Sequence, residues 1–183
     1  MESMLALKDD CMRFAAPWRA CALIASVAAC SPIAMEGLVA QEVAGIPQGA
    51  ARIEFRPIDG ANTEFSRLMD GRRLVIRGPT EWEMFWNDLN GHLTPTPALP
   101  VIDFSRQTVI AASMGQRPSG GHAIRIEEVF EDDQRVFAVA VETSPGPDCF
   151  TTQIITSPVA TVVVDRVGRE VEFVERSETL ECD

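Results

Sequence analysis

Histidine, lysine and long hydrophobic runs are all scarce in this sequence. Histidine occurs only as His92 and His122, so a Ser–His–Asp catalytic set would have to use one of these two rings. Lys8 is the only lysine, and arginine supplies every other basic side chain. The uncharged apolar run at residues 20–29 is ten residues long, whereas a helix that crosses a bilayer core needs about 20. This run is therefore too short to span a membrane.

The chain is strongly acidic, with a formal net charge of −11. Residues 1–29 contain three acidic and three basic side chains, so the rest of the chain carries the whole imbalance. This charge argues against nucleic acid as a partner, because phosphate binding needs a positive field. It also disfavours electrostatic attachment to anionic lipid, so a covalent lipid would have to provide any membrane anchor.

We expect residues 1–29 to be a signal peptide. Arg13 and Arg19 precede the apolar run, and the small residues of Val27-Ala28-Ala29-Cys30 follow it. This is the order of segments in a secretory signal, and its last four residues resemble the bacterial lipoprotein box. The resemblance predicts lipidation of Cys30 and a lipid-anchored place in the bacterial cell envelope. Residues 30–49, rich in alanine, glycine, proline and serine, are expected to be a tether, and residues 50–183 a single globular domain.

Three alternatives for the N-terminus stay open. The apolar run would be a buried N-terminal helix if it were not cleaved. Cleavage without lipid, near Ala29 or after Ala40, would give a soluble periplasmic or secreted protein. Met4 and Met12 are alternative starts, because the polar stretch before the run is long and includes acidic residues.

Two of the five cysteines fall in the expected globular domain. Cys11 and Cys21 lie in the signal and Cys30 is the lipid site, which leaves Cys149 and Cys182. An even pair in an oxidising compartment predicts one disulfide. Two free thiols and a metal site are the alternatives. No metal site is predicted, because two cysteines without a nearby histidine make a poor zinc centre.

The pattern of apolar residues predicts a mainly β (α+β) fold, an antiparallel sheet or sandwich with one amphipathic helix packed on it. Residues 135–142 are apolar on both faces, which is typical of a central strand. The predicted strands are residues 51–58, 72–77, 108–114, 123–130, 135–143, 150–157, 159–165 and 170–175.

One helix is predicted to begin at Pro79 and to end near Asn90-Gly91. Thr80 and Glu83 have the spacing of a capping box, and Gly91 would provide a left-handed cap. Residues 82, 85, 86 and 89 form an aromatic and aliphatic stripe at helical spacing, which we expect to pack on the sheet. Residues 92–100 contain three prolines and are expected to form an irregular crossing loop.

No catalytic set is convincing, and we predict neither enzymatic activity nor a cofactor. The chain has no Gly-x-Ser-x-Gly elbow, phosphate loop, dinucleotide fingerprint or haem motif. The acidic pairs Glu127-Glu128 and Asp132-Asp133 are adjacent in sequence, and the second is expected to be an exposed hairpin turn rather than a calcium site. The nucleophile candidates and the groups that would have to activate them are Ser113, Ser119, Thr152, His92, His122, Asp103 and Asp148.

A glycine-rich loop lies between two predicted strands and is the candidate recognition site. Three glycines and a proline in eight residues fix an unusual backbone path. Constrained loops on a β scaffold are common recognition sites, although a tight connection between two strands would use the same residues. The loop consists of Gly115, Gln116, Arg117, Pro118, Ser119, Gly120, Gly121 and His122.

The region around this loop resembles the C-terminal domain of the PrcB family of protease-complex subunits. The matching stretches are Asp103-Phe104-Ser105, the strand 108–114 with the glycine loop and residues 123–126, then 139–145 and 152–158, which together cover residues 103–164. The resemblance implies an exported, often lipid-anchored protein whose founding type stabilises a surface protease complex without being catalytic. Members often carry tyrosine after the double glycine, where this chain has His122.

These observations predict a non-enzymatic envelope lipoprotein that binds another protein. The partner expected is a protease or another envelope complex, with the lipid anchor as its membrane contact and no small-molecule substrate. Two alternatives stay open. The loop also resembles the Pro-Thr-Thr-Gly-Tyr loop of chagasin-type protease inhibitors, which would make Gly115–His122 an inhibitory loop, and an enzyme of unknown type is the other.

Overall fold

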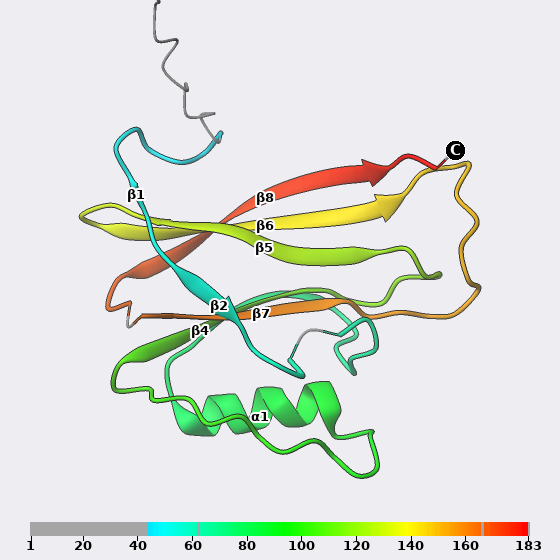
Figure 1. Cartoon of the computed structure of the whole chain (residues 1–183), viewed down its shortest axis with the longest axis horizontal. Coiled ribbons are helices and arrows are strands. Elements are labelled where there is room, and N and C mark those ends of the chain that lie inside the picture. The colour runs from blue at the N-terminus through cyan, green and yellow to red at the C-terminus, as the bar shows by residue number, and fades with distance from the viewer. Residues whose placement is uncertain (1–43, 62, 166, 183) are drawn as a thin grey trace, which may run out of the picture. The chain divides into compact units, whose positions relative to one another are not determined.

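Two four-stranded β-sheets and one helix make up the described part of the chain (Figure 1). The structure is a computed structural model that describes residues 44–61, 63–165 and 167–182. The predicted signal peptide, Cys30 and most of the predicted tether lie outside the described residues. No described helix is long and apolar enough to span a membrane. The predicted fold class, a mainly β sandwich with one packed helix, is confirmed.

Sheet A has the strand order β1-β5-β6-β8, and sheet B has the order β2-β7-β4-β3. All pairings are antiparallel except that of β6 with β8, which run parallel. The strands of sheet A are β1 (Ala51–Arg52), β5 (Ala123–Glu131), β6 (Arg135–Pro145) and β8 (Glu170–Leu180). Those of sheet B are β2 (Phe55–Pro57), β7 (Val159–Asp165), β4 (Gln107–Met114) and β3 (Gly71–Ile76).

The core between the sheets is built from small and branched aliphatic residues. Ala138 and Ala140 of β6 face the same cluster as Ile110 of β4 and Val162 of β7. The opposite face of β6 is also buried, with Phe137 only 1% exposed. The guanidinium of Arg135 lies 5.6 Å from the centre of the Phe137 ring and covers it as a cation–π contact. The prediction of a central strand that is covered on both faces is therefore confirmed.

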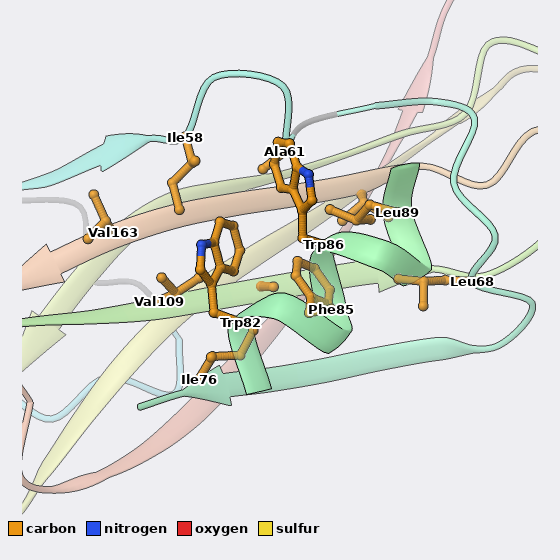
Figure 2. Packing of buried hydrophobic residues seen from close by; sticks show 12 residues of the cluster. Ile58, Ala61, Leu68, Ile76, Trp82, Phe85, Trp86, Leu89, Val109 and Val163 are labelled. Carbon is orange, nitrogen blue, oxygen red and sulfur yellow. The ribbon is translucent and has the colours of Figure 1, made fainter. Parts of the chain in front are cut away.

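Helix α1 (Pro79–Asn90) packs its predicted stripe on the outer face of sheet B. Trp82, Phe85, Trp86 and Leu89 are all buried there, against Val109 of β4 and other core residues (Figure 2). The indole N–H groups of the two tryptophans donate to the carbonyl oxygens of Pro100 and Pro97, at 2.9 and 3.0 Å. These bonds hold the proline-rich loop along the helix and satisfy two buried donors.

The predicted helix caps are wrong at both ends. The helix begins after Gly78, without a hydrogen bond from a capping side chain, because Pro79 already occupies the first turn and needs no donor partner. At the other end Gly91 keeps a right-handed conformation, with φ −64°. A Cβ atom on Gly91 would lie 2.6 Å from the carbonyl oxygen of Asn87. Glycine is therefore required there for close approach and not for left-handed dihedral angles.

Two predicted strands also differ from the structure. The strand expected at residues 51–58 is divided into β1 and β2, which belong to different sheets, so this segment passes from sheet A to sheet B. The strand expected at residues 150–157 is an irregular segment in which only Thr156 and Ser157 form isolated bridges. Its backbone follows the glycine loop instead of a sheet, as the bond from Gly120 N–H to Thr152 O shows.

Candidate functional site: the loop end of the sandwich

Three irregular segments meet at one end of the sandwich, which we call the loop end. They are the glycine loop (residues 115–122), the strap (residues 149–158) and the entry segment (residues 63–70). Arg117 bridges to Thr156, and Phe65 bridges to Ser157, so the strap lies between the other two segments. Figure 1 shows the strap as the yellow-to-orange connection from β6 to β7, beyond the ends of β6 and β8.

The glycines of the loop are needed because other parts of the chain approach them closely. Gly115 has φ +71°, and a Cβ atom there would lie 2.7 Å from the backbone of Asp70 and Gly71. A Cβ atom on Gly120 would lie 2.4 Å from Thr152 Oγ1. At Gly115 the neighbouring backbone would have to move to admit a Cβ atom, whereas at Gly120 the side chain of Thr152 would have to move. The unusual backbone path is therefore explained by internal packing.

The hydroxyl groups of two of the three candidate nucleophiles, Ser113 and Ser119, form local hydrogen bonds. The Ser113 hydroxyl is buried and accepts a hydrogen bond from Gly115 N–H. The Ser119 hydroxyl donates to the carbonyl oxygen of Gly120 at 3.1 Å and not to the imidazole of His122. Asp103 accepts hydrogen bonds from Ser105, which lower the pKa of its carboxyl group. Within the described residues, no Ser–His hydrogen bond of the kind that activates a serine joins the predicted groups.

His122 follows the double glycine of the loop, and its ring is partly buried. Its Nδ1 atom has no hydrogen-bond partner within the described part of the chain. Burial, followed by the positive charge of Arg117, lowers the pKa of the ring. The neutral imidazole is therefore favoured at this position.

An ion-pair cluster joins the glycine loop to both sheets. Arg73 of β3 donates to Glu142 of β6 at 2.8 Å and to Glu175 of β8 at 2.6 Å, and it also donates to the carbonyl oxygen of Ser113. These carboxylates, Glu175 first, raise the pKa of Arg73. Arg117 of the glycine loop pairs with the second oxygen of Glu142 at 3.4 Å. The cluster therefore fixes the root of the loop to sheet A and to the edge of sheet B.

The carboxylates of the adjacent pair Glu127-Glu128 form ion pairs with arginines. Glu127 pairs with Arg125 and Arg176, beside a β-bulge in β5, and Glu128 pairs with Arg52. Within the described residues, no group of three histidine, cysteine or acidic side chains is arranged to hold a metal ion.

The turn between β5 and β6 is stabilised by Asp132. Its carboxylate accepts hydrogen bonds from the backbone N–H groups of Arg135 and Gln134, which lower its pKa. An open cavity of about 430 Å³ lies beside this turn, lined by residues 47–51, residues 131–133 and Arg169. Arg169 itself pairs with Glu131, so the charges that line the cavity are partly neutralised.

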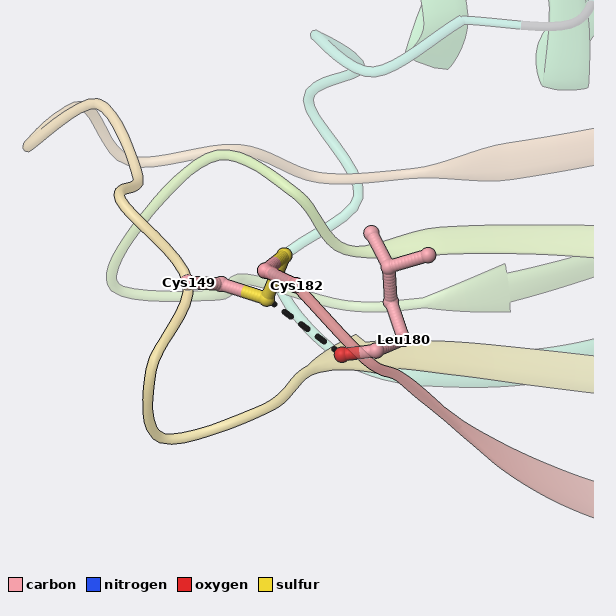
Figure 3. Close-up of a disulfide and its surroundings, with 3 residues drawn as sticks. All are labelled: Cys149, Leu180 and Cys182. Carbon is pink, nitrogen blue, oxygen red and sulfur yellow. Dashed lines mark hydrogen bonds between the residues drawn. A yellow bond between two sulfur atoms is a disulfide. The ribbon is translucent and has the colours of Figure 1, made fainter.

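The predicted disulfide forms between Cys149 and Cys182, whose Cα atoms are 5.1 Å apart. It ties the start of the strap to the chain just beyond β8. The Cys149 sulfur lies 3.3 Å from the carbonyl oxygen of Leu180 (Figure 3). Because a disulfide sulfur carries no proton, we treat this as a polar contact and not as a hydrogen bond. Gly146 N–H donates to the same carbonyl oxygen at 2.9 Å.

Large apolar side chains are exposed at the loop end, and sequence reasoning missed them. Phe150 is fully exposed and Ile155 is 62% exposed. The strand predicted for residues 150–157 would have buried alternate side chains of this segment, whereas the irregular strap exposes several of them. Six of the large exposed apolar side chains belong to the strap, the entry segment and the end of β8, and together we call them the loop-end apolar surface: Phe65, Met69, Phe150, Ile154, Ile155 and Leu180.

Residues 108–165 match the family model described as PrcB C-terminal. The match confirms, over this segment, the resemblance stated from the sequence. It contains β4, the glycine loop, β5, β6, the strap and β7, whereas α1, β3, β8 and Cys182 lie outside it. Neither a curated protein nor a solved structure matches the chain.

Proposed function

We propose, from the PrcB C-terminal segment, that this protein is a non-catalytic subunit that stabilises a protease or another envelope complex through its loop end. The segment supports association with a protease complex, because the family is one of protease-complex subunits. We place the binding site at the loop end because the loop-end apolar surface lies there. Three of its members, Phe150, Ile154 and Ile155, are exposed close together on the strap, and grouped apolar side chains mark interaction surfaces more often than isolated ones do.

The strap is held in place before any partner binds. The disulfide fixes its start, Thr152 accepts from Gly120 at its middle, and Thr156 exchanges two backbone hydrogen bonds with Arg117 near its end. A segment fixed in this way loses little conformational entropy on binding, so more of the free energy of apolar burial contributes to affinity.

The proposal also includes export and lipid attachment at Cys30. The N-terminal order of basic, apolar and small residues supports it. A lipid at that position would hold the domain at a membrane through residues 31–49. Replacing Cys30 by serine should abolish incorporation of a labelled fatty acid and move the protein to the soluble fraction. Unchanged labelling would contradict lipidation, without bearing on the loop end.

A quantitative pull-down from detergent-solubilised envelope tests the loop end. Wild-type protein should capture a protease or its complex, and Ile155→Asp should reduce that capture at least about tenfold, because a charge replaces an apolar contact. Val101→Asp is the matched control, since Val101 is 98% exposed and lies just after the proline-rich loop, outside the three segments of the loop end. Equal capture by wild type and Ile155→Asp would contradict the proposed site, and recovery of no partner would contradict the proposed function.

A further inference from the structure

The four edge strands of the sandwich are not equally protected against pairing with another chain. β1 has two residues and β2 has three, the last of them Pro57. β3 has six residues, and its Arg73 meets Glu142 and Glu175 of sheet A. Short length and proline are two of the usual ways to block an edge. β8 is different, because it runs for eleven residues without proline or glycine.

Four of the five charged side chains of β8 form ion pairs with residues of other strands. Glu172 pairs with Arg135 of β6 at 2.5 Å, and Glu178 pairs with Arg125 of β5 at 2.9 Å. Arg176 pairs with Glu127 of β5, and Glu175 pairs with Arg73 of β3. None of these four partners lies beyond the free edge of β8, because one is on the adjacent β6, two are on β5 and one is on β3 of the other sheet. The outer backbone groups of β8 are left open, since no described strand pairs with that side.

We propose that the free edge of β8 receives an extended, basic segment of a partner protein as a fifth strand of sheet A. Main-chain hydrogen bonds would supply the affinity, as in other cases of strand addition. The inference goes beyond the loop-end proposal and does not depend on it. The two sites lie close together, because β8 ends at Leu180, which is a member of the loop-end apolar surface.

The negative charge of this chain determines which kind of strand would bind at the free edge of β8. Of the net −11, residues 1–29 contribute zero and residues 30–43 contribute only Glu36 and Glu42, so the remaining residues carry −9 and contain no lysine. β8 itself has four glutamates and one arginine. This field attracts a strand that carries lysine or arginine and repels a second copy of the chain.

Hydrogen–deuterium exchange of the full chain tests this inference. The probe is a ten-residue peptide of alternating lysine and threonine, with the corresponding glutamate–threonine peptide as its control. The lysine peptide should slow amide exchange in residues 170–180, and the glutamate peptide should not. The protection should weaken as the salt concentration rises.

Matched variants locate the effect. Glu170 is exposed, makes no ion pair within the described residues and lies at the start of β8, so Glu170→Lys should weaken binding of the lysine peptide by about threefold or more. Glu83→Lys makes the same change in charge on helix α1 and should have less effect. No added protection with the lysine peptide would overturn the inference. Full protection of residues 170–180 in the free chain would also overturn it, because the edge would then already be occupied.

Discussion

At the scale of single residues, the glycine loop is explained by what touches it. The sequence correctly indicates a constrained backbone, since three glycines lie in eight residues. It does not indicate that Asp70, Gly71 and Thr152 occupy the space where a Cβ atom would stand at Gly115 and Gly120. The same glycine pattern is compatible with an active-site turn, a ligand cradle or an internal contact. Only the packing distinguishes them.

Gly115→Ala should therefore destabilise the fold. The substitution places a side chain at positive φ and against backbone atoms 2.7 Å away. We expect the free energy of unfolding to fall by at least about 2 kcal/mol. Gly168→Ala is the control, because no atom lies within 4 Å of its Cβ position, and it should change the free energy by less than about 0.5 kcal/mol. Urea unfolding measures both, and equal effects would show that the loop is not tightly packed.

At the scale of elements, the strap is the feature that determines the proposed site. The disulfide and the glycine loop hold it, and it belongs to neither sheet. The apolar pattern of residues 150–157 is typical of a strand, yet the side chains of Phe150, Ile154 and Ile155 are exposed. An irregular segment with exposed apolar residues cannot be distinguished from a strand by periodicity alone.

Loss of the disulfide should loosen the strap while sheet B and α1 stay folded. The bond closes a sequence separation of 33 residues, for which the chain-entropy account gives about 3–4 kcal/mol of stability. The double substitution Cys149→Ser and Cys182→Ser should lower the free energy of unfolding by about that amount. It should also raise amide exchange in residues 146–155 more than in β4. Unchanged exchange in the strap would show that the glycine loop alone holds it.

Elements with a regular pattern were the predictable ones. The stripe at residues 82, 85, 86 and 89 gave the helix and its buried face, and the two apolar faces of residues 136–141 gave the central strand. The helix caps and the division between β1 and β2 were missed. The division depends on contacts from distant parts of the chain, as does the parallel pairing of β6 with β8, and such contacts leave no local pattern in the sequence.

At the scale of the whole molecule, two surfaces suited to a protein partner meet at one end. The loop-end apolar surface includes Leu180, and the free edge of β8 leads to the same residue. Cys149 and Cys182 join the strap to this point. A partner that covers the apolar surface and adds a strand to β8 would make one continuous interface. The sequence predicts a protein-binding role with the glycine loop as the recognition site. It does not indicate that the strap or the edge of β8 could contact a partner.

The proposed function requires that the loop end stabilises a partner protease. The most direct measurement is the half-life of that protease in cells that lack this protein, complemented by the wild-type chain, by Phe150→Asp with Ile155→Asp, or by Val101→Asp. We expect the wild type and Val101→Asp to restore the half-life, and the double substitution to leave the protease short-lived despite normal levels of the folded variant. Full restoration by the double substitution would contradict the claim.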